Sequence, residues 1–254
     1  MLLARSSGMP TQPVVRKPVR IAAVGDLHCT KASVGSIGPW ITTVNERADI
    51  LLLCGDLTDY GTHEEVQVLI KELSGVRIPM LAVLGNHDHE SGLGSEVTAH
   101  LRECGVQVLE GETTEVCGIG FVGTKGFAGG FGTSTLGHWG EPSIKRFVQD
   151  AIDEALKLEA GLARLRTEHR VVLLHYAPVR DTVEGEPVDI HAFLGCSRLE
   201  EPLLRYPVSA VFHGHAHRGQ LEGKTSKGSP VYNVAAPLLR RNFPDQPAYR
   251  IVEL

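Results

Sequence analysis

The sequence has few cysteines and no long apolar run, and each shortage excludes a class of protein. Its five cysteines are odd in number and form no CxxC pair, which argues against a disulfide framework and against a thiolate zinc site. No apolar run approaches the roughly 20 residues that a membrane-spanning helix needs. A net charge of −5 offers no basic surface for nucleic acid. We therefore expect a cytoplasmic protein for which neither a membrane nor nucleic acid is a partner.

The length and the apolar content indicate one globular domain. With 254 residues, of which 42% are hydrophobic, the chain can bury a full core. Residues 1–18 show no periodicity and predict a disordered N-terminal tail, which leaves residues 19–254 as a single domain. Monomer and homodimer both stay open, because the helix expected at residues 142–166 has enough apolar residues for a core or an interface.

Five β-rich apolar runs end directly in polar side chains that can bind metals. The runs cover residues 19–25, 50–55, 80–85, 171–174 and 208–212. Strand ends of an open α/β sheet present ligands to a crevice. A single histidine at a strand end is more often a hydrogen-bonded structural residue, but five such ends in one chain favour a site. The polar residues that follow the runs are Asp26 and His28, Asp56 and Asp59, Asn86 to Asp88, His175, and His213, His215 and His217.

The residues at these strand ends supply enough ligands for two metal ions. A dinuclear centre needs a bridging carboxylate, terminal ligands for each ion, and open positions for water and substrate. Asp, Asn and His side chains suit Mn, Fe or Zn, and the lack of thiolates argues against a closed structural zinc site. One ion would be over-supplied by the seven candidate ligands, which are Asp26, His28, Asp56, Asn86, His175, His215 and His217.

The remaining sequence predicts helices, short strands and a long loop. Apolar spacing indicates helices at residues 39–48, 62–73, 96–104, 142–166 and 197–206, and Thr62 with Glu65 forms a capping-box pattern. Residues 107–109, 114–117 and 119–123 predict a three-strand meander of a mixed or antiparallel sheet. Residues 178–195 read as irregular, and a hairpin around residues 223–228 with strands at 230–234 and 249–254 completes the sheets. For the Gly-rich loop at residues 124–140, a functional role and an ordinary surface loop are equally favoured.

The order of these motifs resembles that of the calcineurin-like metallophosphoesterases. The pattern runs Asp26-x-His28, Gly55-Asp56-x-x-Asp59, Gly85-Asn86-His87-Asp88, a lone His175, and Gly214-His215-x-His217, over residues 19–220. The resemblance implies a four-layer α/β/β/α sandwich, in which two mixed β-sheets are flanked by helices. It also implies one metal ion on Asp26, His28, Asp56 and His217. A second ion would be held by Asp56 as the bridging ligand with Asn86, His175 and His215.

The resemblance further implies hydrolysis of a phosphate ester by a metal-bridging hydroxide, with His87 protonating the leaving group. Asp88 is expected to orient the His87 ring, and Asn86 and His87 to contact the substrate. Arg180 and His213 are weaker candidates for phosphate binding, with an exposed salt bridge and a packing role as their alternatives. Asp59 either supports the metal site or caps the following helix.

Several functions are compatible with these residues. A phosphodiesterase acting on small esters, including cyclic nucleotides, is favoured over a phosphomonoesterase, because no cap domain is visible after the Gly85-Asn86-His87-Asp88 motif. A protein phosphatase is a weaker variant, and a binding scaffold that has lost catalysis is a minor alternative. The scaffold reading predicts eroded ligands, whereas all seven are present.

Overall fold

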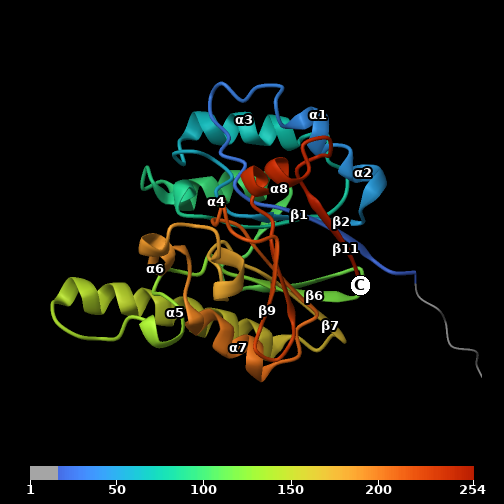
Figure 1. The fold of residues 1–254 in the computed structure, drawn as a ribbon. Coiled ribbons are helices and arrows are strands. Elements are labelled where there is room, and N and C mark those ends of the chain that lie inside the picture. The colour runs from blue at the N-terminus through green and yellow to red at the C-terminus, as the bar shows by residue number, and fades with distance from the viewer. Residues whose placement is uncertain (1–16) are drawn as a thin grey trace, which may run out of the picture.

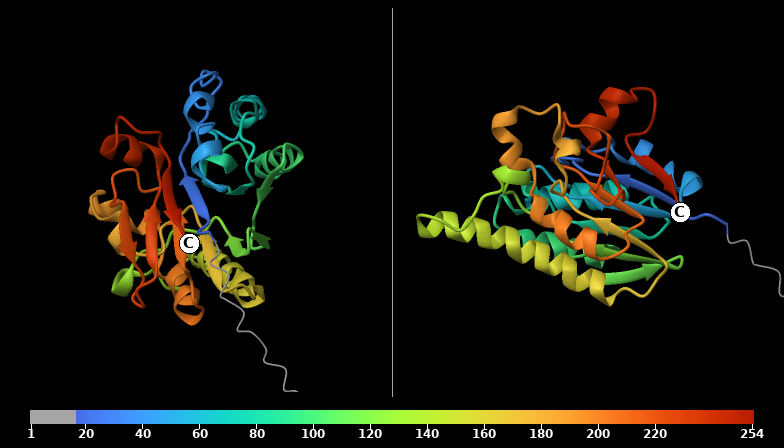
Figure 2. Two further views of the ribbon diagram at one scale, coloured as in Figure 1. Left: turned by 90° about the vertical axis from the view of Figure 1, so that its right-hand side faces the viewer. Right: turned by 60° about the horizontal axis from the view of Figure 1, so that its bottom comes forward.

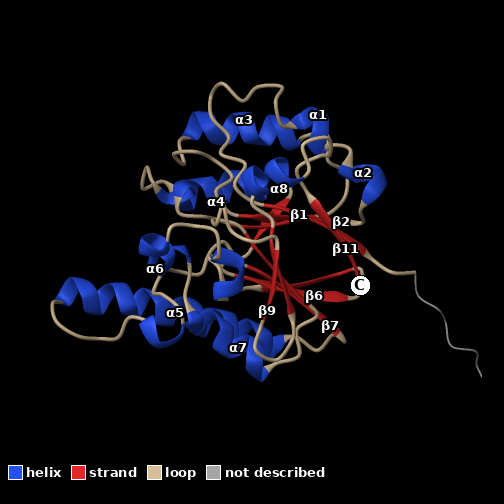
Figure 3. Cartoon of the chain, viewed as in Figure 1, coloured by secondary structure: helices blue, strands red, loops and turns tan. Residues whose placement is uncertain are grey.

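Two β-sheets stack face to face, and helices cover the outer face of each (Figure 1). The computed structural model describes residues 17–254, so most of the predicted tail at residues 1–18 lies outside the described part. Figure 3 shows the strands gathered in the centre with helices above and below them. This arrangement is the α/β/β/α sandwich that the resemblance implied. None of the helices within residues 17–254 combines the length and the apolar composition that crossing a bilayer requires.

The first sheet is mostly parallel. β1, β2, β3 and β4 run in the same direction, and β11 pairs antiparallel with β1. Within residues 17–254 its strands are, in spatial order, β11 (Arg250–Glu253), β1 (Arg20–Val24), β2 (Ile50–Cys54), β3 (Met80–Val83) and β4 (Val106–Val108).

The second sheet has a parallel centre between two antiparallel edges. β6, β7, β8 and β10 are parallel, whereas β5 and β9 pair antiparallel with their neighbours. Within the same residues its spatial order is β5 (Thr113–Val116), β6 (Ile119–Gly123), β7 (His169–Leu173), β8 (Ala210–His213), β10 (Pro230–Asn233) and β9 (Glu222–Lys224).

The expected three-strand meander is wrong, because its first strand belongs to the other sheet. β4 follows helix α4 and lies parallel to β3. A strand–helix–strand crossover of this kind places the returning strand beside the one it left. Only β5 and β6 form an antiparallel hairpin. Short strands carry too few residues for their sequence to reveal their partners.

The helices divide between the two outer faces. In Figure 1, α1 to α4 lie above the first sheet, and α5 and α7 lie below the second; Figure 2 shows α5 running along that lower face. The helices of the described residues are α1 (Gly38–Ile41), α2 (Val44–Arg47), α3 (His63–Leu73), α4 (Gly94–Glu103), α5 (Pro142–Arg164), α6 (His191–Leu194), α7 (Glu200–Arg205) and α8 (Ala236–Asn242). Short 3-10 turns occur at His87–His89, Gly132–Ser134, Arg180–Val183, Val188–Ile190 and Ser197–Leu199.

Local hydrogen bonds explain where the helices differ from expectation. The helix expected at residues 39–48 is broken into α1 and α2, because the hydroxyls of Thr42 and Thr43 donate to the carbonyls of Gly38 and Trp40. The helix expected at residues 197–206 begins as a 3-10 turn and continues as α7, and α6 and α8 were not expected. The capping box at Thr62 and Glu65 is present and starts α3.

The alternation of side chains along the second sheet builds two cores. Phe121, Leu173 and Phe212 face the first sheet and are fully buried with its strands. Val172 and Val211, on the opposite face, pack with Leu158 and Leu162 of α5 and with α7. Both faces of the second sheet are therefore covered, which fixes the strand register and the positions of the strand ends.

Candidate metal centre

The carboxyl ends of five strands from both sheets meet at one place. Parallel strands share an edge, so β1, β2 and β3 deliver Asp26, Asp56 and Asn86 together, and β7 and β8 deliver His175 and His215. The two edges are joined directly, because the Nδ1 atom of His175 donates to the Cys54 carbonyl at 3.0 Å. The structure thus brings together the polar residues that follow the five predicted runs.

One group of ligands is formed by Asp26, His28 and His217, whose candidate ligand atoms lie within 4.8 Å of one another. The Nε2 atom of His217 is 2.9 Å from Oδ1 of Asp26. The Nε2 atom of His28 is buried and has no hydrogen-bond partner in the described structure. An orphaned buried ring nitrogen is costly, and a metal ion at this position would satisfy it.

A second group contains Asp56, His175 and His215, again within 4.8 Å of one another. The Nε2 atom of His175 lies 3.3 Å from Oδ1 of Asp56 and 3.0 Å from Oδ1 of Asn86. The Nε2 atom of His215 donates to the Phe193 carbonyl at 3.1 Å, which leaves Nδ1 as the nitrogen with a free lone pair. These four side chains offer two imidazoles, one carboxylate and one amide oxygen to a single ion.

Asp56 lies between the two groups. Its Oδ1 atom faces His175, and its Oδ2 atom is 3.9 Å from Nε2 of His28. A carboxylate whose two oxygens face different ligand groups has the arrangement of a bridging ligand. The donor chemistry and the orphaned nitrogen of His28 therefore fit two metal ions on the seven residues named from the sequence.

The charges of the buried Asp56 and His175 side chains favour a cation at the candidate site. Burial acts to raise the pKa of Asp56, but the facing His175 ring and the His87 amide hold that pKa well below its usual range. Burial acts to lower the pKa of His175, yet the Asp56 carboxylate raises it to about 9. A proton on His175 thus balances the buried negative charge, and a metal cation can replace that proton.

The backbone is held in a rare conformation at four of the ligands. Asp26, His28, Asp56 and His215 have φ angles of 55°, 45°, 48° and 69°, in the left-handed region that most side chains avoid. Among residues 17–254 the only other non-glycine residue of this kind is Cys117, in the turn between β5 and β6. Such strain is typical of functional sites, where the surrounding structure fixes a side chain in position.

Two glycines of the motifs allow the strand ends to approach one another. A Cβ atom on Gly55 would lie 2.5 Å from Nδ1 of His175, and a Cβ atom on Gly85 would collide with the Asp56 carboxylate. Gly55 also has a φ of 81°. The glycines are therefore required by the close packing of the ligand loops.

His87 lies beside the first ligand group, but its orientation does not come from Asp88. The His87 Nδ1 atom donates to the Asp59 carbonyl at 2.7 Å, and its ring meets the His28 ring edge-on at 4.6 Å between centroids. Asp88 is fully buried and accepts hydrogen bonds from the amides of Leu57, Thr58 and Gly85 and from the Thr58 hydroxyl. The expected orienting contact is therefore wrong, and Asp88 instead ties together the loops after β2 and β3.

Asp59 contacts a candidate metal ligand directly. Its Oδ1 atom accepts a hydrogen bond from Nδ1 of His28 at 3.0 Å, which directs the orphaned Nε2 atom toward Asp26 and Asp56. The alternative, a cap for the following helix, is not observed, since Thr62 and Glu65 cap α3. A carboxylate behind a histidine ligand fixes the ring and its tautomer.

The weaker candidates lack the contacts that were expected of them. His213 is fully buried, with its ring nitrogens bonded to the Gly214 carbonyl and the Thr182 hydroxyl, so it has no surface for a substrate. Burial lowers its pKa to about 4, which keeps the ring neutral. Arg180 forms the exposed ion pair with Glu184 that was its alternative. Beside the candidate ligand His28, Cys29 is buried, and burial raises its pKa to about 12, so its thiol stays protonated at neutral pH.

Some features near the centre were not foreseen from the sequence. The carbonyls of Cys54 and Phe193, which hold His175 and His215, carry no signal in a sequence. Tyr176 was overlooked although it directly follows a ligand; its ring lies 4.5 Å from that of His215. The Gly-rich loop is irregular apart from one 3-10 turn, and its glycines bond to residues near Phe193.

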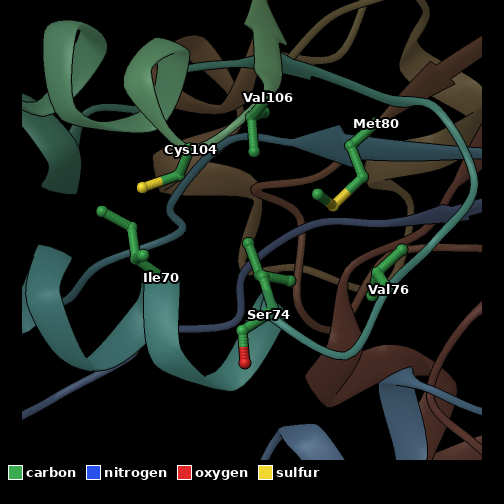
Figure 4. A pocket seen from close by; sticks show the side chains of 7 residues that line it. Ile70, Ser74, Val76, Met80, Cys104 and Val106 are labelled. Carbon is green, nitrogen blue, oxygen red and sulfur yellow. The ribbon is translucent and has the colours of Figure 1, made fainter.

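A separate hollow lies away from the strand ends. It has a volume of about 320 Å³ and lies between α3, β3 and β4, where Figure 4 shows mostly apolar side chains. No ligand of the metal centre lines it. Its lining residues are Ile70, Leu73, Ser74, Val76, Met80, Cys104 and Val106.

Comparison with known proteins agrees with this architecture. A family model described as calcineurin-like phosphoesterase matches residues 19–219, so the chain belongs to the calcineurin-like phosphoesterase family. Over 91% of this chain and 95% of the other, the fold is similar to phosphopantetheinyl hydrolase from Mycobacterium tuberculosis, with a TM-score of 0.67 and 16% identity. A likeness at that identity shows the fold alone.

Two curated relatives are each identical to this chain at about a quarter of the aligned residues. One is named "Probable glycerophosphodiester phosphodiesterase GpdQ", from Arcobacter nitrofigilis; it is 25% identical over 189 residues, which cover 70% of this chain and 60% of that protein. The other, from Vesicomyosocius okutanii, is named "Probable cyclic nucleotide phosphodiesterase"; it is 25% identical over 179 residues, or 67% of this chain and 63% of that protein. The chain thus matches about three fifths of the length of each relative.

Proposed function

We propose that the protein is a dinuclear metal-dependent phosphoesterase that hydrolyses small phosphate esters. The observation that carries the proposal is the pairing of two ligand groups through Asp56, with the orphaned Nε2 atom of His28 facing the gap. Two ions, divalent or trivalent, would bind there; the nitrogen and oxygen donors suit Mn, Fe or Zn. Asp26, His28, Asp56 and His217 would hold one ion, and Asp56, Asn86, His175 and His215 the other.

A phosphodiesterase is the favoured activity. Both curated relatives carry phosphodiesterase names, one for glycerophosphodiesters and one for cyclic nucleotides. Cyclic nucleotides are therefore the first natural esters to test, and a phosphomonoesterase is the alternative. The cytoplasmic location and the oligomeric state stay predictions, and all five cysteines are free, as a reducing compartment would require.

The chain's own residues perform the remaining tasks of hydrolysis. When bound, the ions would supply Lewis acidity, which activates water near neutral pH and stabilises charge on the phosphoryl group. His87 is positioned to move a proton: the Asp59 carbonyl fixes Nδ1, and its side chain is 38% exposed, so Nε2 can reach a leaving-group oxygen. Asn86 and His87 would contact the phosphoryl group. Asp88 acts as a positioning residue that keeps the two loops together.

The activity is tested by comparing an aryl phosphate monoester with an aryl phosphate diester after reconstitution with Mn²⁺. Metal content is measured on the same samples, and Asp56→Asn serves as the variant expected to lose both metal and turnover. Preference for the diester supports a phosphodiesterase, and cyclic nucleotides are then assayed. Preference for the monoester overturns the substrate class while keeping the metal centre. Absence of turnover with metal bound favours a non-catalytic scaffold.

A further inference from the structure

A lysine lies at a sixth strand end, directly beside the metal ligand His175. Lys125 follows β6, which is parallel to β7 and reaches the same edge of the sheet. The Lys125 carbonyl accepts hydrogen bonds from the amides of His175 and Tyr176, at 3.0 and 3.1 Å. The backbone of Lys125 is therefore fixed to the strand end that supplies a metal ligand.

The Lys125 ammonium is half-buried and lacks an anionic partner. It donates to the Gly126 carbonyl at 3.0 Å, which leaves two of its three N–H groups without a partner in residues 17–254. No carboxylate within those residues forms an ion pair with it at 4.0 Å or less. The neighbouring Glu154 is occupied by the Lys157 ammonium, the Thr124 hydroxyl and the Gly126 amide. Charges that are withdrawn from water are normally paired, so an unpaired, half-buried ammonium is unusual.

Aromatic rings connect this ammonium to the metal centre. Its nitrogen lies 4.7 Å from the centre of the Phe127 ring and 5.1 Å from that of Tyr176. The Tyr176 ring in turn packs against the ring of His215, at 4.5 Å between centroids. Burial lowers the pKa of Lys125; the Glu154 carboxylate opposes this most strongly, and the Asp56 carboxylate of the candidate centre acts in the same direction more weakly. The ammonium thus lies one aromatic ring away from His215, a candidate ligand of the centre.

An anion held at the metal centre would supply the missing partner. Two ions would engage two phosphoryl oxygens, whereas a terminal phosphate has three non-bridging oxygens and carries two negative charges. We propose that Lys125 binds a non-bridging oxygen of the phosphoryl group, so that the site also binds, and hydrolyses, esters with a terminal dianionic phosphate. This inference rests on the proposed function, because it adds a substrate contact at the same centre.

Orthophosphate is the probe that tests this contact without relying on turnover. Its dissociation constant is measured by calorimetry at about pH 8, with metal-loaded wild type and the variants Lys125→Gln and Lys125→Arg. We expect Lys125→Gln to weaken binding by roughly 10- to 100-fold, as for the loss of a charge-assisted hydrogen bond, and Lys125→Arg to restore part of it. Lys145→Gln, an exposed lysine of α5, serves as the matched control and should bind phosphate like wild type.

A purely structural role for Lys125 predicts different results. It would lower the thermal unfolding midpoint of Lys125→Gln and leave phosphate affinity unchanged. An unchanged dissociation constant, a loss that also appears in Lys145→Gln, or a wild type that does not bind millimolar phosphate would each overturn the inference.

Kinetics separate this inference from the proposed function. In Lys125→Gln, kcat/KM for an aryl monoester should fall at least 10-fold more than for an aryl diester, because only the monoester has the third non-bridging oxygen. Equal losses on both esters would overturn the contact while leaving the hydrolase intact. Phosphate binding that depends on Lys125, in a metal-loaded protein that turns over neither ester, would instead overturn the hydrolase and leave the contact standing.

Discussion

At the scale of single residues, the backbone fixes the candidate metal ligands. Two backbone hydrogen bonds hold three of the residues with left-handed φ angles. The Asp26 amide donates to the Gly55 carbonyl at 2.9 Å, and the His28 amide donates to the carbonyl of Asp56, the third residue, at 3.0 Å. Each left-handed residue costs on the order of 1–3 kcal/mol, which the surrounding structure must offset. The fold itself therefore holds the backbone of these candidate ligands.

His87 is the residue whose role is tested most directly. We expect His87→Ala to reduce hydrolysis of an alkyl ester by about 10²-fold or more, because a poor leaving group needs a proton. Hydrolysis of a nitrophenyl ester, whose leaving group is already a stable anion, should fall much less. Initial rates on both esters measure the difference. His89→Ala, an exposed histidine two residues further on, is the control; similar losses on both esters in His87→Ala would exclude the general-acid role.

Asp59 is predicted to set the affinity of the ion on His28. Since its carboxylate holds Nδ1 of His28 at 3.0 Å, Asp59→Ala should lower metal affinity by roughly 10- to 100-fold. Titration against a chromophoric chelator measures this affinity, and Asp245→Ala removes an exposed carboxylate for comparison. If the two variants retain wild-type affinity, the contact has no effect on metal binding.

The sequence predicts the ligand residues better than it predicts their neighbours. Asp26, Asp56 and His175 could be named because each directly follows an apolar run, and the strand direction then brings them together. Whether Asp88 or Asp59 touches His87 depends on the path of two loops after their strands. That path is set by tertiary packing, so adjacency in the sequence indicated the wrong aspartate, and the actual contact is made by the Asp59 backbone carbonyl.

At the scale of elements, α3 positions the loop that follows His28. The Glu72 carboxylate, near the end of α3, accepts hydrogen bonds from the amides of Gly35, Ile37 and Gly38, at 2.6, 2.8 and 2.7 Å. The side chain is only 6% exposed. One buried carboxylate thus accepts hydrogen bonds from the backbone amides at the start of α1. It also attaches the loop to α3, which is itself packed on the first sheet.

Loss of Glu72 should therefore destabilise the fold more than it affects the metal centre. We expect Glu72→Ala to lower the free energy of unfolding by about 2–4 kcal/mol, because three amides, including the buried amide of Ile37, lose a charged acceptor. Glu64→Ala, which removes an exposed carboxylate in the first turn of the same helix, should destabilise the fold much less, because solvent screens that charge. Denaturant titrations measure both values. Equal destabilisation by the two substitutions would contradict this role.

The elements could be predicted where apolar spacing and capping residues carry the signal, and could not where other contacts decide the structure. α3 was predicted with its capping box, and α5 from its long apolar face. The partner of β4 depends on contacts that a short sequence window does not contain, whereas the break between α1 and α2 rests on local hydroxyl–carbonyl bonds that apolar spacing does not report. The sandwich itself followed from the order of motifs, since apolar periodicity alone does not specify how two sheets stack.

At the scale of the whole molecule, the candidate metal centre lies at the interface between the two sheets and connects them. His175, from the second sheet, donates to the Cys54 carbonyl of the first. The Asp26 carboxylate, from the first sheet, accepts a hydrogen bond from the His215 amide at 3.0 Å. Its Oδ1 atom also lies 2.9 Å from Nε2 of His217. Buried charges of both signs therefore cross the interface, and the stability of the sandwich depends on their balance.

The stability of the ion-free protein should consequently fall as the pH rises above neutral. The pKa of His175 is about 9 in the folded protein, above its ordinary value of 6.5, so its proton stabilises the fold fully below pH 6.5. That contribution is lost as the pH rises through 9, because the buried Asp56 carboxylate then faces a neutral ring. Metal ions replace the proton, so the metal-loaded protein should keep its unfolding midpoint over this range. The unfolding midpoint is measured between pH 6.5 and 9, with Mn²⁺ and after chelation. If the midpoints of the two forms change with pH in the same way, a protonated His175 does not replace the metal ion.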